Sequence, residues 1–244
     1  MGLTVTVLGC DASYPSPGGA CSGYLVESGR TRLWLDAGTG TMAALSPEQL
    51  ESIDGIVLTH AHPDHWTDVL VFHHLVKYYR PRDAIPVWSP ARVQELVRAV
   101  NGDDLAPLAW AVIDATSRVT CGDLSLSFSR TDHGPETLAV RLDGGGVSVA
   151  YSADTGPGWA MSSLGDGLGL ALIEATLDAA HEGVVQHLSG RQAGLMAEEA
   201  GARALVLTHI DPDVSGTEQL EAAKTTFRGP VSLATPGARY EVQP

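Results

Sequence analysis

The chain has 244 residues, of which 44% are hydrophobic, and it carries a formal net charge of −14 at pH 7. This length and composition fit one domain, residues 1–244, around a single core, and no apolar run approaches the ~18 residues that would cross a bilayer. A long basic run is absent as well, which argues against a protein that grips a nucleic-acid backbone.

Short apolar runs rich in Val, Leu and Ile predict strands along the whole chain, and amphipathic segments between some of them predict helices. The predicted strands are Leu3–Leu8, Tyr24–Glu27, Leu33–Leu35, Gly55–Leu58, Pro86–Trp88, Leu124–Ser129, Leu138–Leu142, Val147–Tyr151, Leu170–Glu174 and Ala204–Leu207. The predicted helices are Asp68–Tyr79, Pro90–Asn101, Ser189–Ala200 and Thr217–Phe227. Runs of strands with helices between them indicate an α/β fold with two sheets and helices on the outer faces.

The N-terminal segment Met1–Val5 lacks a basic region ahead of an apolar one, so we expect no secretory signal and a cytoplasmic location. The three cysteines, Cys10, Cys21 and Cys121, give no even disulfide framework and lack the spacing of a metal site. We expect them to be reduced thiols without a catalytic role.

The segment His60-Ala61-His62-Pro63-Asp64-His65 gathers four metal-binding side chains within six residues. His133, which follows a predicted strand, Asp154, and His209, which ends another, are further candidates. Imidazole and carboxylate suit borderline divalent ions such as zinc, and seven such groups are too many for one tetrahedral site. They are about the number needed for two ions that share one carboxylate. The first two histidines are two positions apart and point to the same side of an extended backbone, so both can reach one ion.

The hexapeptide matches the H-x-H-x-D-H motif of the metallo-β-lactamase superfamily at every position, and the resemblance extends through Ser152–Gly156 to Leu207–His209. It implies the αββα sandwich of that family. It also implies the metal ligands: His60, His62 and His133 for the first ion, Asp64, His65 and His209 for the second, and Asp154 as the bridge. Asp64 would also orient the attacking hydroxide. Asp36 resembles the family's aspartate that accepts hydrogen bonds next to the ligand loop.

Lactam-cleaving members of the family typically use a cysteine in the second site, whereas this chain has Asp154 at the fourth motif and no suitably placed cysteine. The complete His/Asp set resembles that of hydrolases such as glyoxalase II and of phosphodiesterases. Two ions ~3.5–4 Å apart can hold a bridging hydroxide and neutralise an anionic transition state, which suits phosphodiester cleavage. From the imidazole and carboxylate donors we expect Zn²⁺, with Mn²⁺ and Fe²⁺ as alternatives.

The segment Gln186–Gly194 resembles the H-x-[ST] motif of the ribonuclease Z and cyclic-nucleotide phosphodiesterase branch. Ser189 and Gln192 form a capping box, so we expect a helix to begin just after Ser189. A helix N-terminus stabilises a phosphate, and His187 next to it can donate a proton to the departing oxygen or steady the phosphoryl oxygens. The loop within Gly9–Leu25 also resembles that branch, and such loops lie at the rim of the site.

Ribonuclease Z proteins carry a long arm between the third and fourth motifs that grips the tRNA elbow, whereas His133 and Asp154 are only 21 positions apart in this chain. The one basic cluster, Lys77–Arg82, ends a predicted helix on the order of 20 Å from the ligands, where basic groups favour a helix C-terminus. The whole pattern looks most like the actinobacterial-type proteins related to cyclic-nucleotide phosphodiesterases. We therefore expect a small phosphodiester substrate, most of all a cyclic nucleotide.

Two alternatives stay open at this point. One is a tRNA 3′-end endonuclease of the ribonuclease Z type that works through a partner subunit's surface. The other is a metal-binding scaffold without activity, against which the complete ligand set argues. Neither a membrane nor a nucleic acid is the expected partner. Dimers are common in the family, so the resemblance leaves a homodimer open.

Overall fold

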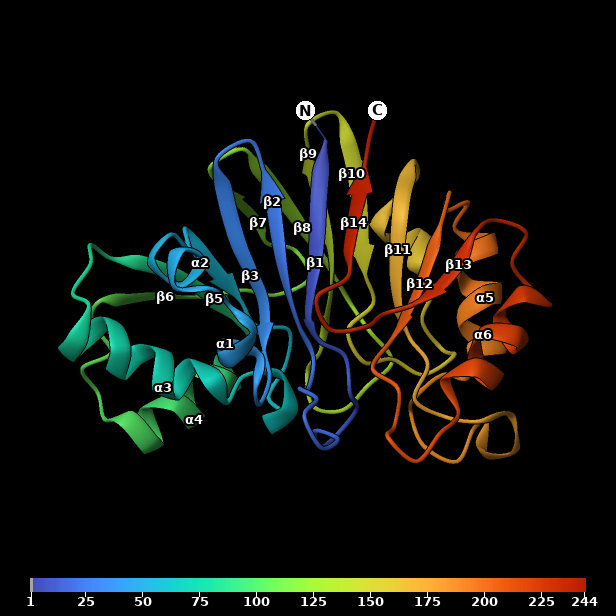
Figure 1. Cartoon of the computed structure of the whole chain (residues 1–244), viewed down its shortest axis with the longest axis horizontal. Coiled ribbons are helices and arrows are strands. Elements are labelled where there is room, and N and C mark those ends of the chain that lie inside the picture. The colour runs from blue at the N-terminus through green and yellow to red at the C-terminus, as the bar shows by residue number, and fades with distance from the viewer. Residues whose placement is uncertain (1) are drawn as a thin grey trace.

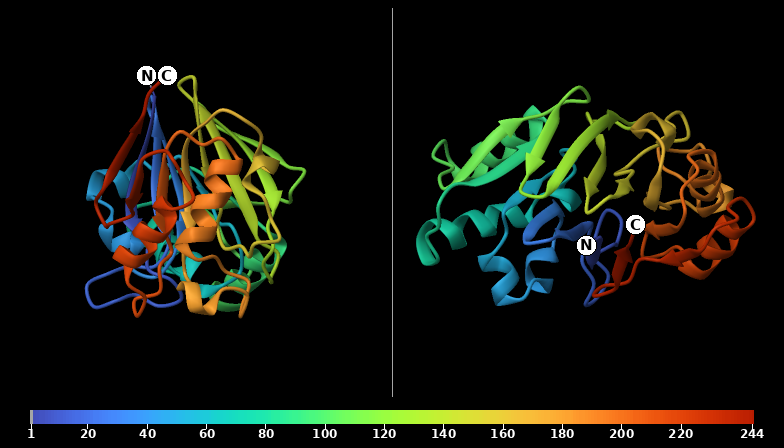
Figure 2. Two further views of the ribbon diagram at one scale, coloured as in Figure 1. Left: turned by 90° about the vertical axis from the view of Figure 1, so that its right-hand side faces the viewer. Right: turned by 90° about the horizontal axis from the view of Figure 1, so that it is seen from above.

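The computed structural model describes residues 2–244, which form a sandwich of two seven-stranded sheets (Figures 1 and 2). The strand order in the first sheet is β14 (Arg239–Val242), β1 (Leu3–Gly9), β2 (Gly23–Ser28), β3 (Thr31–Ala37), β4 (Gly55–Val57), β5 (Ile85–Ser89) and β6 (Leu108–Val112). The order in the second sheet is β13 (Val231–Leu233), β12 (Leu205–Thr208), β11 (Leu168–Glu174), β10 (Val147–Tyr151), β9 (Leu138–Gly144), β8 (Leu124–Arg130) and β7 (Arg118–Cys121). Because β14 pairs with β1, the two ends of the chain lie side by side.

Helices cover the outer face of each sheet (Figure 1). Those over the first sheet are α1 (Thr41–Ala44), α2 (Pro47–Glu51), α3 (Asp68–His74), its π-helical continuation η2 (Leu75–Tyr79) and α4 (Ala91–Asn101). Those over the second sheet are α5 (Gly190–Glu199) and α6 (Gly216–Lys224), and single 3-10 turns occur at η1 (Pro63–His65), η3 (Met161–Leu164) and η4 (Ala179–His181). The predicted αββα sandwich is confirmed.

Three apolar layers hold the sandwich together. One lies between the sheets, where Tyr24 and Tyr151 meet edge to face. A second lies under the helices of the first sheet around Trp34 and Phe72, and a third lies under α5 and α6 around Phe227. Central strands are therefore buried on both faces, which is why they are continuous apolar runs in the sequence.

All ten predicted strands are present, and the four that the sequence did not predict are the four edge strands β6, β7, β13 and β14. An edge strand has a neighbour on one side only and keeps exposed or partly exposed residues, as β6 and β14 do. Such strands leave no continuous apolar run to recognise. The predicted helices are present as well, although the one over Asp68–Tyr79 changes to π-helical geometry from Leu75 onward.

Strained backbone gathers at the end of the sandwich opposite the termini. Among residues 2–244, four non-glycine residues have a positive φ: Ser13 at 59°, Asp36 at 55°, Ala153 at 51° and His209 at 49°. Ser13, Ala153 and His209 lie in loops that follow strands, and Asp36 lies near the end of β3. A left-handed conformation costs a side-chain-bearing residue roughly 1–3 kcal/mol and persists where the surroundings require it, often at a functional site. In the part of the chain described, no helix combines the length and apolar character needed to cross a membrane.

Candidate metal centre

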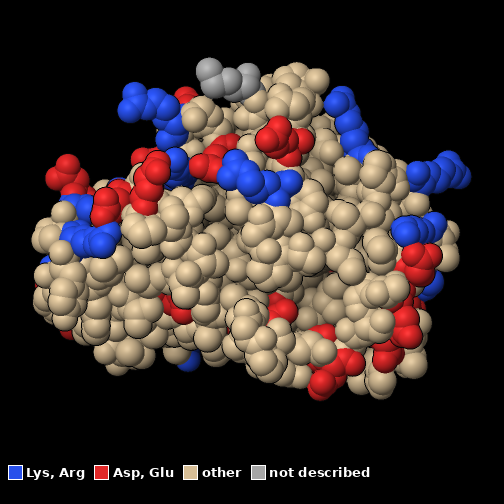
Figure 3. Space-filling view, in the orientation of Figure 1, with Lys and Arg blue, Asp and Glu red and all other residues tan. Residues whose placement is uncertain are grey.

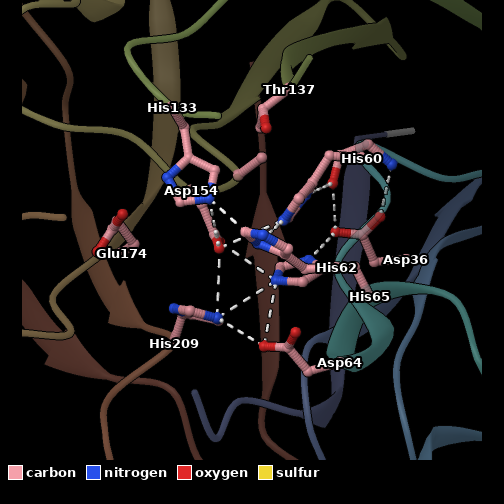
Figure 4. A network of polar contacts seen from close by, with 12 residues as sticks. Asp36, His60, His62, Asp64, His65, His133, Thr137, Asp154, Glu174 and His209 are labelled. Atoms are coloured by element: carbon pink, nitrogen blue, oxygen red, sulfur yellow. Dashed lines mark hydrogen bonds and ion pairs between the residues drawn. The ribbon is translucent and has the colours of Figure 1, made fainter. Parts of the chain in front are cut away.

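All seven predicted ligands lie together where the loops of the two sheets meet (Figure 4). Those contributed by the first sheet follow β4: His60, His62, Asp64 and His65. Those contributed by the second sheet follow β8, β10 and β12: His133, Asp154 and His209. The ligand atoms form a set of four and a set of three, and within each set all atoms lie within 4.8 Å of one another.

The first set surrounds a point between three imidazoles and one carboxylate. His62 Nδ1 lies 3.2 Å from His60 Nε2 and 3.1 Å from His133 Nε2. Asp154 Oδ2 lies 3.4 Å from His60 Nε2 and 3.8 Å from His133 Nε2. Ligands of a tetrahedral zinc, each ~2.0–2.1 Å from the ion, are about 3.3 Å from one another. The four atoms therefore have the spacing needed to hold one ion.

The second set is built in the same way and shares the carboxylate of the first. His65 Nε2 lies 3.2 Å from His209 Nε2 and 3.6 Å from Asp64 Oδ2. His209 Nε2 lies 3.2 Å from Asp64 Oδ2. Asp154 Oδ1 lies 3.2 Å from His65 Nε2 and 3.5 Å from His209 Nε2. One oxygen of Asp154 thus faces each set, as a bridging ligand requires.

The bridging position of Asp154 has a second sign. Its Oδ1 is buried, yet it has no hydrogen-bond partner among the described residues. A buried carboxylate oxygen without a donor is costly unless a cation compensates it. The donor set, its spacing and this oxygen together fit two divalent ions.

Asp36 orients two of the histidines from behind, as the sequence predicted. It is fully buried, and its Oδ2 accepts hydrogen bonds from His65 Nδ1 at 2.8 Å and from Tyr151 Oη at 3.1 Å. Thr59 donates from its hydroxyl to the same oxygen at 2.9 Å, so the Thr59 oxygen can accept from His60 Nδ1 at 3.1 Å. Both imidazoles therefore turn Nε2 towards the ligand sets.

Acceptors in the second sheet orient two more histidines. His133 Nδ1 donates to the backbone carbonyl of Gln186 at 3.0 Å. His209 Nδ1 lies 2.9 Å from Thr176 Oγ1, which in turn lies 2.7 Å from Glu174 Oε2. A hydroxyl that donates to the carboxylate can accept from the imidazole. These partners fix Nε2 of both histidines as the ligand atom.

At His60, His62 and Asp154, burial and neighbouring charges favour the protonation states that bind a divalent ion, whereas burial of His65 is outweighed by nearby carboxylates, Asp154 first, which raise its pKa. Burial lowers the pKa of His60 to about 4, and the adjacent His65 contributes in the same direction. Burial also lowers the pKa of His62. Although burial opposes ionisation of Asp154, His209 and the other histidines hold the pKa of its carboxyl well below the ordinary range. Neutral imidazoles and an ionised carboxylate are the forms that metal binding requires.

His187 lies beside the ligand sets without belonging to the predicted seven. One of its ring nitrogens lies within 4.8 Å of ligand atoms of Asp154 and His209. Its Nδ1 donates to Glu174 Oε1 at 2.8 Å. Burial opposes protonation of His187, but the Glu174 carboxylate outweighs it and raises the pKa of His187 to about 9. The ring is therefore protonated at neutral pH.

Glu174 was not predicted as a site residue. It is completely buried, and its two oxygens accept hydrogen bonds from Thr155 N at 2.7 Å and Leu188 N at 3.2 Å as well as from His187 and Thr176. The available signal was a lone carboxylate at the carboxyl end of an otherwise apolar predicted strand. A charge in such a position needs partners, and here they are site residues.

The expected phosphate site at the start of α5 is partly occupied by the protein's own groups. The capping box is present, because Ser189 Oγ accepts from Gln192 N at 3.2 Å and Gln192 Oε1 accepts from Ser189 N at 3.0 Å. However, Gly190 N donates to Gln219 Oε1, and Ser189 Oγ donates to Glu182 Oε1 at 2.5 Å. The helix start is thus already supplied with acceptors from the protein, so these groups are not free to hold a phosphate.

The loop within Gly9–Leu25 reaches the site, as expected of a rim. The Ser13 backbone N–H donates to Asp64 Oδ2 at 2.9 Å, and the Tyr14 hydroxyl donates to Asp213 Oδ2 at 3.0 Å. The loop therefore contacts one ligand directly and the segment after His209 through a side chain. Its positive φ at Ser13 aims that amide at the ligand.

Other histidines, the cysteines and the basic cluster lie outside the ligand sets. His73 lies 3.2 Å from the carbonyl of Ala106, and His181 lies 2.7 Å from Asp178. All three cysteines are buried free thiols: Cys10, Cys21 and Cys121. In the basic cluster, Lys77 pairs with Asp104 and Arg80 pairs with Glu51. Arg82 donates to the backbone carbonyls of Leu50 and Ile53.

Comparison with known proteins identifies relatives over the whole chain. A family model described as the β-lactamase superfamily domain matches residues 16–210. An uncharacterized protein of Mycobacterium tuberculosis is 32% identical over 257 residues, which cover 99% of this chain and 93% of that protein. The probable metallo-hydrolase YhfI of Bacillus subtilis is 29% identical over 247 residues, which cover 98% of this chain and all (100%) of YhfI.

Solved structures agree with this assignment. The crystal structure of Bacillus subtilis YhfI has a TM-score of 0.88 at 26% identity and covers 99% of this chain and 100% of its own. The short form of human tRNase Z has a TM-score of 0.78 at 20% identity, covering 98% of this chain and 99% of its own, and this likeness shows the shared fold. The chain belongs to the β-lactamase superfamily, among the metallo-hydrolases related to YhfI and ribonuclease Z.

Proposed function

We propose that the protein hydrolyses a small phosphodiester, with a cyclic nucleotide as the preferred substrate. The observation that carries the proposal is the pairing of a ligand set for two ions with His187, which the buried Glu174 carboxylate holds beside it. The seven proposed ligands are those named above: His60, His62, His133, Asp154, Asp64, His65 and His209. Two divalent ions held there would activate a water molecule and balance the negative charge that develops on the phosphoryl oxygens.

Two side chains of the protein take part in the proposed reaction besides holding ions. Asp64, held by the Ser13 amide at 2.9 Å, orients the attacking water. His187 gives its Nε2 proton to the departing ribose oxygen as the bond from that oxygen to phosphorus breaks. The Glu174 carboxylate, 2.8 Å from Nδ1, stabilises the protonated ring before the transfer and fixes its orientation.

The size of the substrate is inferred from what surrounds the site. The interval from His133 to Asp154 contains only β9, β10 and their connections, which leaves no room for a tRNA-binding arm. In the view of Figure 3, the Lys and Arg side chains gather mainly along the upper part of the molecule, away from the lower end with the site loops, where Asp and Glu prevail. With a net charge of −14 and no basic stripe at the lower end of this face, a polyanion would gain little from binding.

The competing activity is 3′-end processing of tRNA, because human tRNase Z shares the fold and the chain is 27% identical to the ribonuclease Z of Mycobacterium bovis over 278 residues. In that case a partner subunit would have to supply the surface that grips the tRNA. A scaffold that binds metal without catalysis is the remaining alternative.

A substrate panel distinguishes these three cases. Metal-loaded protein is assayed with cyclic AMP, cyclic GMP, 2′,3′-cyclic nucleotides, bis(p-nitrophenyl) phosphate and precursor tRNA. We expect kcat/KM for at least one cyclic nucleotide to exceed that for precursor tRNA. A value for precursor tRNA well above that for every cyclic nucleotide would reverse the ranking, and inertness towards all five substrates would favour the scaffold.

A further inference from the structure

Asp132 connects three loops around the metal centre. It follows β8 and directly precedes His133. Its Oδ2 accepts a hydrogen bond from Gly158 N at 2.9 Å, and its Oδ1 accepts one from Gln186 Nε2 at 3.0 Å. Its backbone carbonyl accepts from Gly156 N at 2.7 Å. One residue thus binds the loop after Asp154 and the segment before His187.

The loop after Asp154 is fitted closely around this carboxylate. A Cβ atom on Gly156 would lie 2.6 Å from Asp132 Oδ2, and a Cβ atom on Gly158 would lie 2.6 Å from the same oxygen. Real side chains do not approach an oxygen so closely, so the two glycines leave the space that the carboxylate occupies. The backbone of this loop therefore fits around the Asp132 carboxylate, and the contact is not an incidental pair on the surface.

Gln186 connects Asp132 to the proposed metal ligand His133. Its side chain is held by Asp132, and its backbone carbonyl accepts from His133 Nδ1 at 3.0 Å, which turns Nε2 of that ring towards His62 at 3.1 Å. The next residue is His187, whose ring centroid lies 4.9 Å from that of His133. The position of Gln186 therefore sets the orientation of a proposed metal ligand and the location of the proposed acid.

Few other contacts hold this part of the chain. Residues 183–186 are exposed and lie outside the helices and strands. Among the hydrogen bonds of residues 2–244, those that join residues 183–186 to anything beyond residues 179–189 are the two made by Gln186, one to Asp132 and one to His133. An exposed segment with so few ties would otherwise move freely.

We propose that Asp132 is a positioning residue, which fixes Gln186 and thereby orients His133 for metal binding and, together with Glu174, places His187 for proton donation. The inference rests on the proposed function, because that proposal gives His133 and His187 their roles. Outer partners of metal-binding histidines are worth about 10–100-fold in metal affinity. Loss of the Asp132 carboxylate should act on the first ion, through His133, more than on the second.

The test compares three variants of the full-length protein: Asp132→Ala, Asp132→Asn and Gln186→Met. The alanine variant removes both side-chain acceptors. The asparagine variant can restore both bonds. Its side-chain oxygen can accept from Gly158 N, and its side-chain NH₂ can donate to the Gln186 side-chain oxygen after the Gln186 amide group has rotated by half a turn. The methionine variant keeps the backbone carbonyl of residue 186 but loses the side-chain bond, and it changes only an exposed side chain.

Zn²⁺ affinity is measured without substrate by competition with a chromophoric chelator. We expect Asp132→Ala and Gln186→Met each to weaken the binding of one Zn²⁺ by about tenfold or more, and Asp132→Asn to restore most of the affinity. The double variant Asp132→Ala/Gln186→Met should be no weaker than the worse single variant, because both changes break the same bond. Histidine ¹⁵N NMR should show that His133 loses its fixed Nδ1–H tautomer in the two weakened proteins.

Two results would overturn the proposed role of Asp132. Wild-type Zn²⁺ affinity in Gln186→Met would exclude the positioning role, and this variant remains informative if Asp132→Ala does not fold. Asparagine as damaging as alanine would mean that the charge of Asp132 matters and not its hydrogen bonds. Since these measurements need no substrate, failure of the phosphodiester assays would refute the proposed function while leaving the role of Asp132 separately tested.

Discussion

At the scale of single residues, the buried carboxylate of Glu174 orients both the proposed proton donor and one proposed metal ligand. Glu174 is close to His187 at 2.8 Å and, through the Thr176 hydroxyl, to His209. Every hydrogen bond that it accepts comes from the site or from the backbone beside it. A buried charge with this many donors is stable, and it imposes orientation on the rings that it contacts.

The role of His187 as an acid predicts a dependence on the leaving group. His187→Ala should leave the metal content unchanged and lower kcat/KM by about 10²–10⁴-fold for a substrate with a poor leaving group. The loss should be much smaller for a p-nitrophenyl ester, whose leaving group hardly needs a proton. Steady-state kinetics on both substrates check this. Equal losses on the two would mean that His187 binds phosphate, and no loss on either would remove it from the mechanism.

The role of Glu174 predicts a shift in the pH profile. Although burial opposes protonation of His187, the Glu174 carboxylate raises the pKa of its ring to about 9, so the acid form persists to alkaline pH. In Glu174→Gln that negative charge is gone and the pKa falls. The alkaline limb of kcat/KM should therefore move to lower pH by about one unit or more.

Glu182→Gln is the matched control for this shift. Glu182 lies in the loop between η4 and α5 that contains His187, but its carboxylate pairs with Arg191 at 2.6 Å and accepts from Ser189. Its removal should leave the alkaline limb where it is. An unmoved limb in Glu174→Gln, with metal content retained, would contradict the assigned cause of the raised pKa.

At the scale of elements, the sequence predicted the inner strands of both sheets and failed at the sheet edges. Strands such as β12 and β10 are mostly apolar and almost entirely buried, and they were recognised, whereas the four edge strands were not. The ligand loop was predictable because four of its ligands lie within six residues. Glu174 and Asp132 were not, because their partners His187 and Gln186 lie 13 and 54 positions away and only the fold joins them.

The difference in burial between α5 and α2 predicts that loss of the capping serine lowers the free energy of unfolding more in α5 than in α2. Ser189 caps α5 and Ser46 caps α2, each with a complete capping box. Ser189→Ala should lower the free energy of unfolding by about 1 kcal/mol, because α5 packs five buried residues against the core. α2 buries none of its residues and can fray locally, so Ser46→Ala should cost clearly less.

Denaturant titration of both variants measures the difference in the free energy of unfolding. Both substitutions remove a capping bond, and Ser189→Ala also removes the bond to Glu182, so the expected difference combines that bond with the packing of the helix. Equal losses for the two would contradict this account of α5.

At the scale of the whole molecule, the metal centre joins the two halves of the sandwich. Four of its proposed ligands follow β4 in the first sheet, and three follow strands of the second sheet. Ions bound at such a seam stabilise only the folded state, in which all seven ligands meet. Metal binding is therefore linked to the stability of the entire fold.

Removal of the metal should consequently lower Tm. Saturation at about 100 times Kd stabilises a protein by roughly 2.7 kcal/mol per ion, which corresponds to roughly 5–10 °C for a domain of this size. Calorimetry before and after treatment with a chelator checks the shift, and added Zn²⁺ should reverse it. Asp154→Ala should hardly respond to the chelator. An unchanged Tm in wild-type protein shown to have lost its metal would contradict the linkage between the halves.

The central claim is that these seven side chains form one two-ion centre bridged by Asp154. Its most direct test is the ratio of metal to protein, measured by elemental analysis after gentle purification in metal-supplemented buffer. We predict two ions per chain in the wild-type protein and a content that falls towards zero in Asp154→Ala, because the carboxylate serves both ions. One ion or none in the wild type, or both ions retained in Asp154→Ala, would contradict the claim.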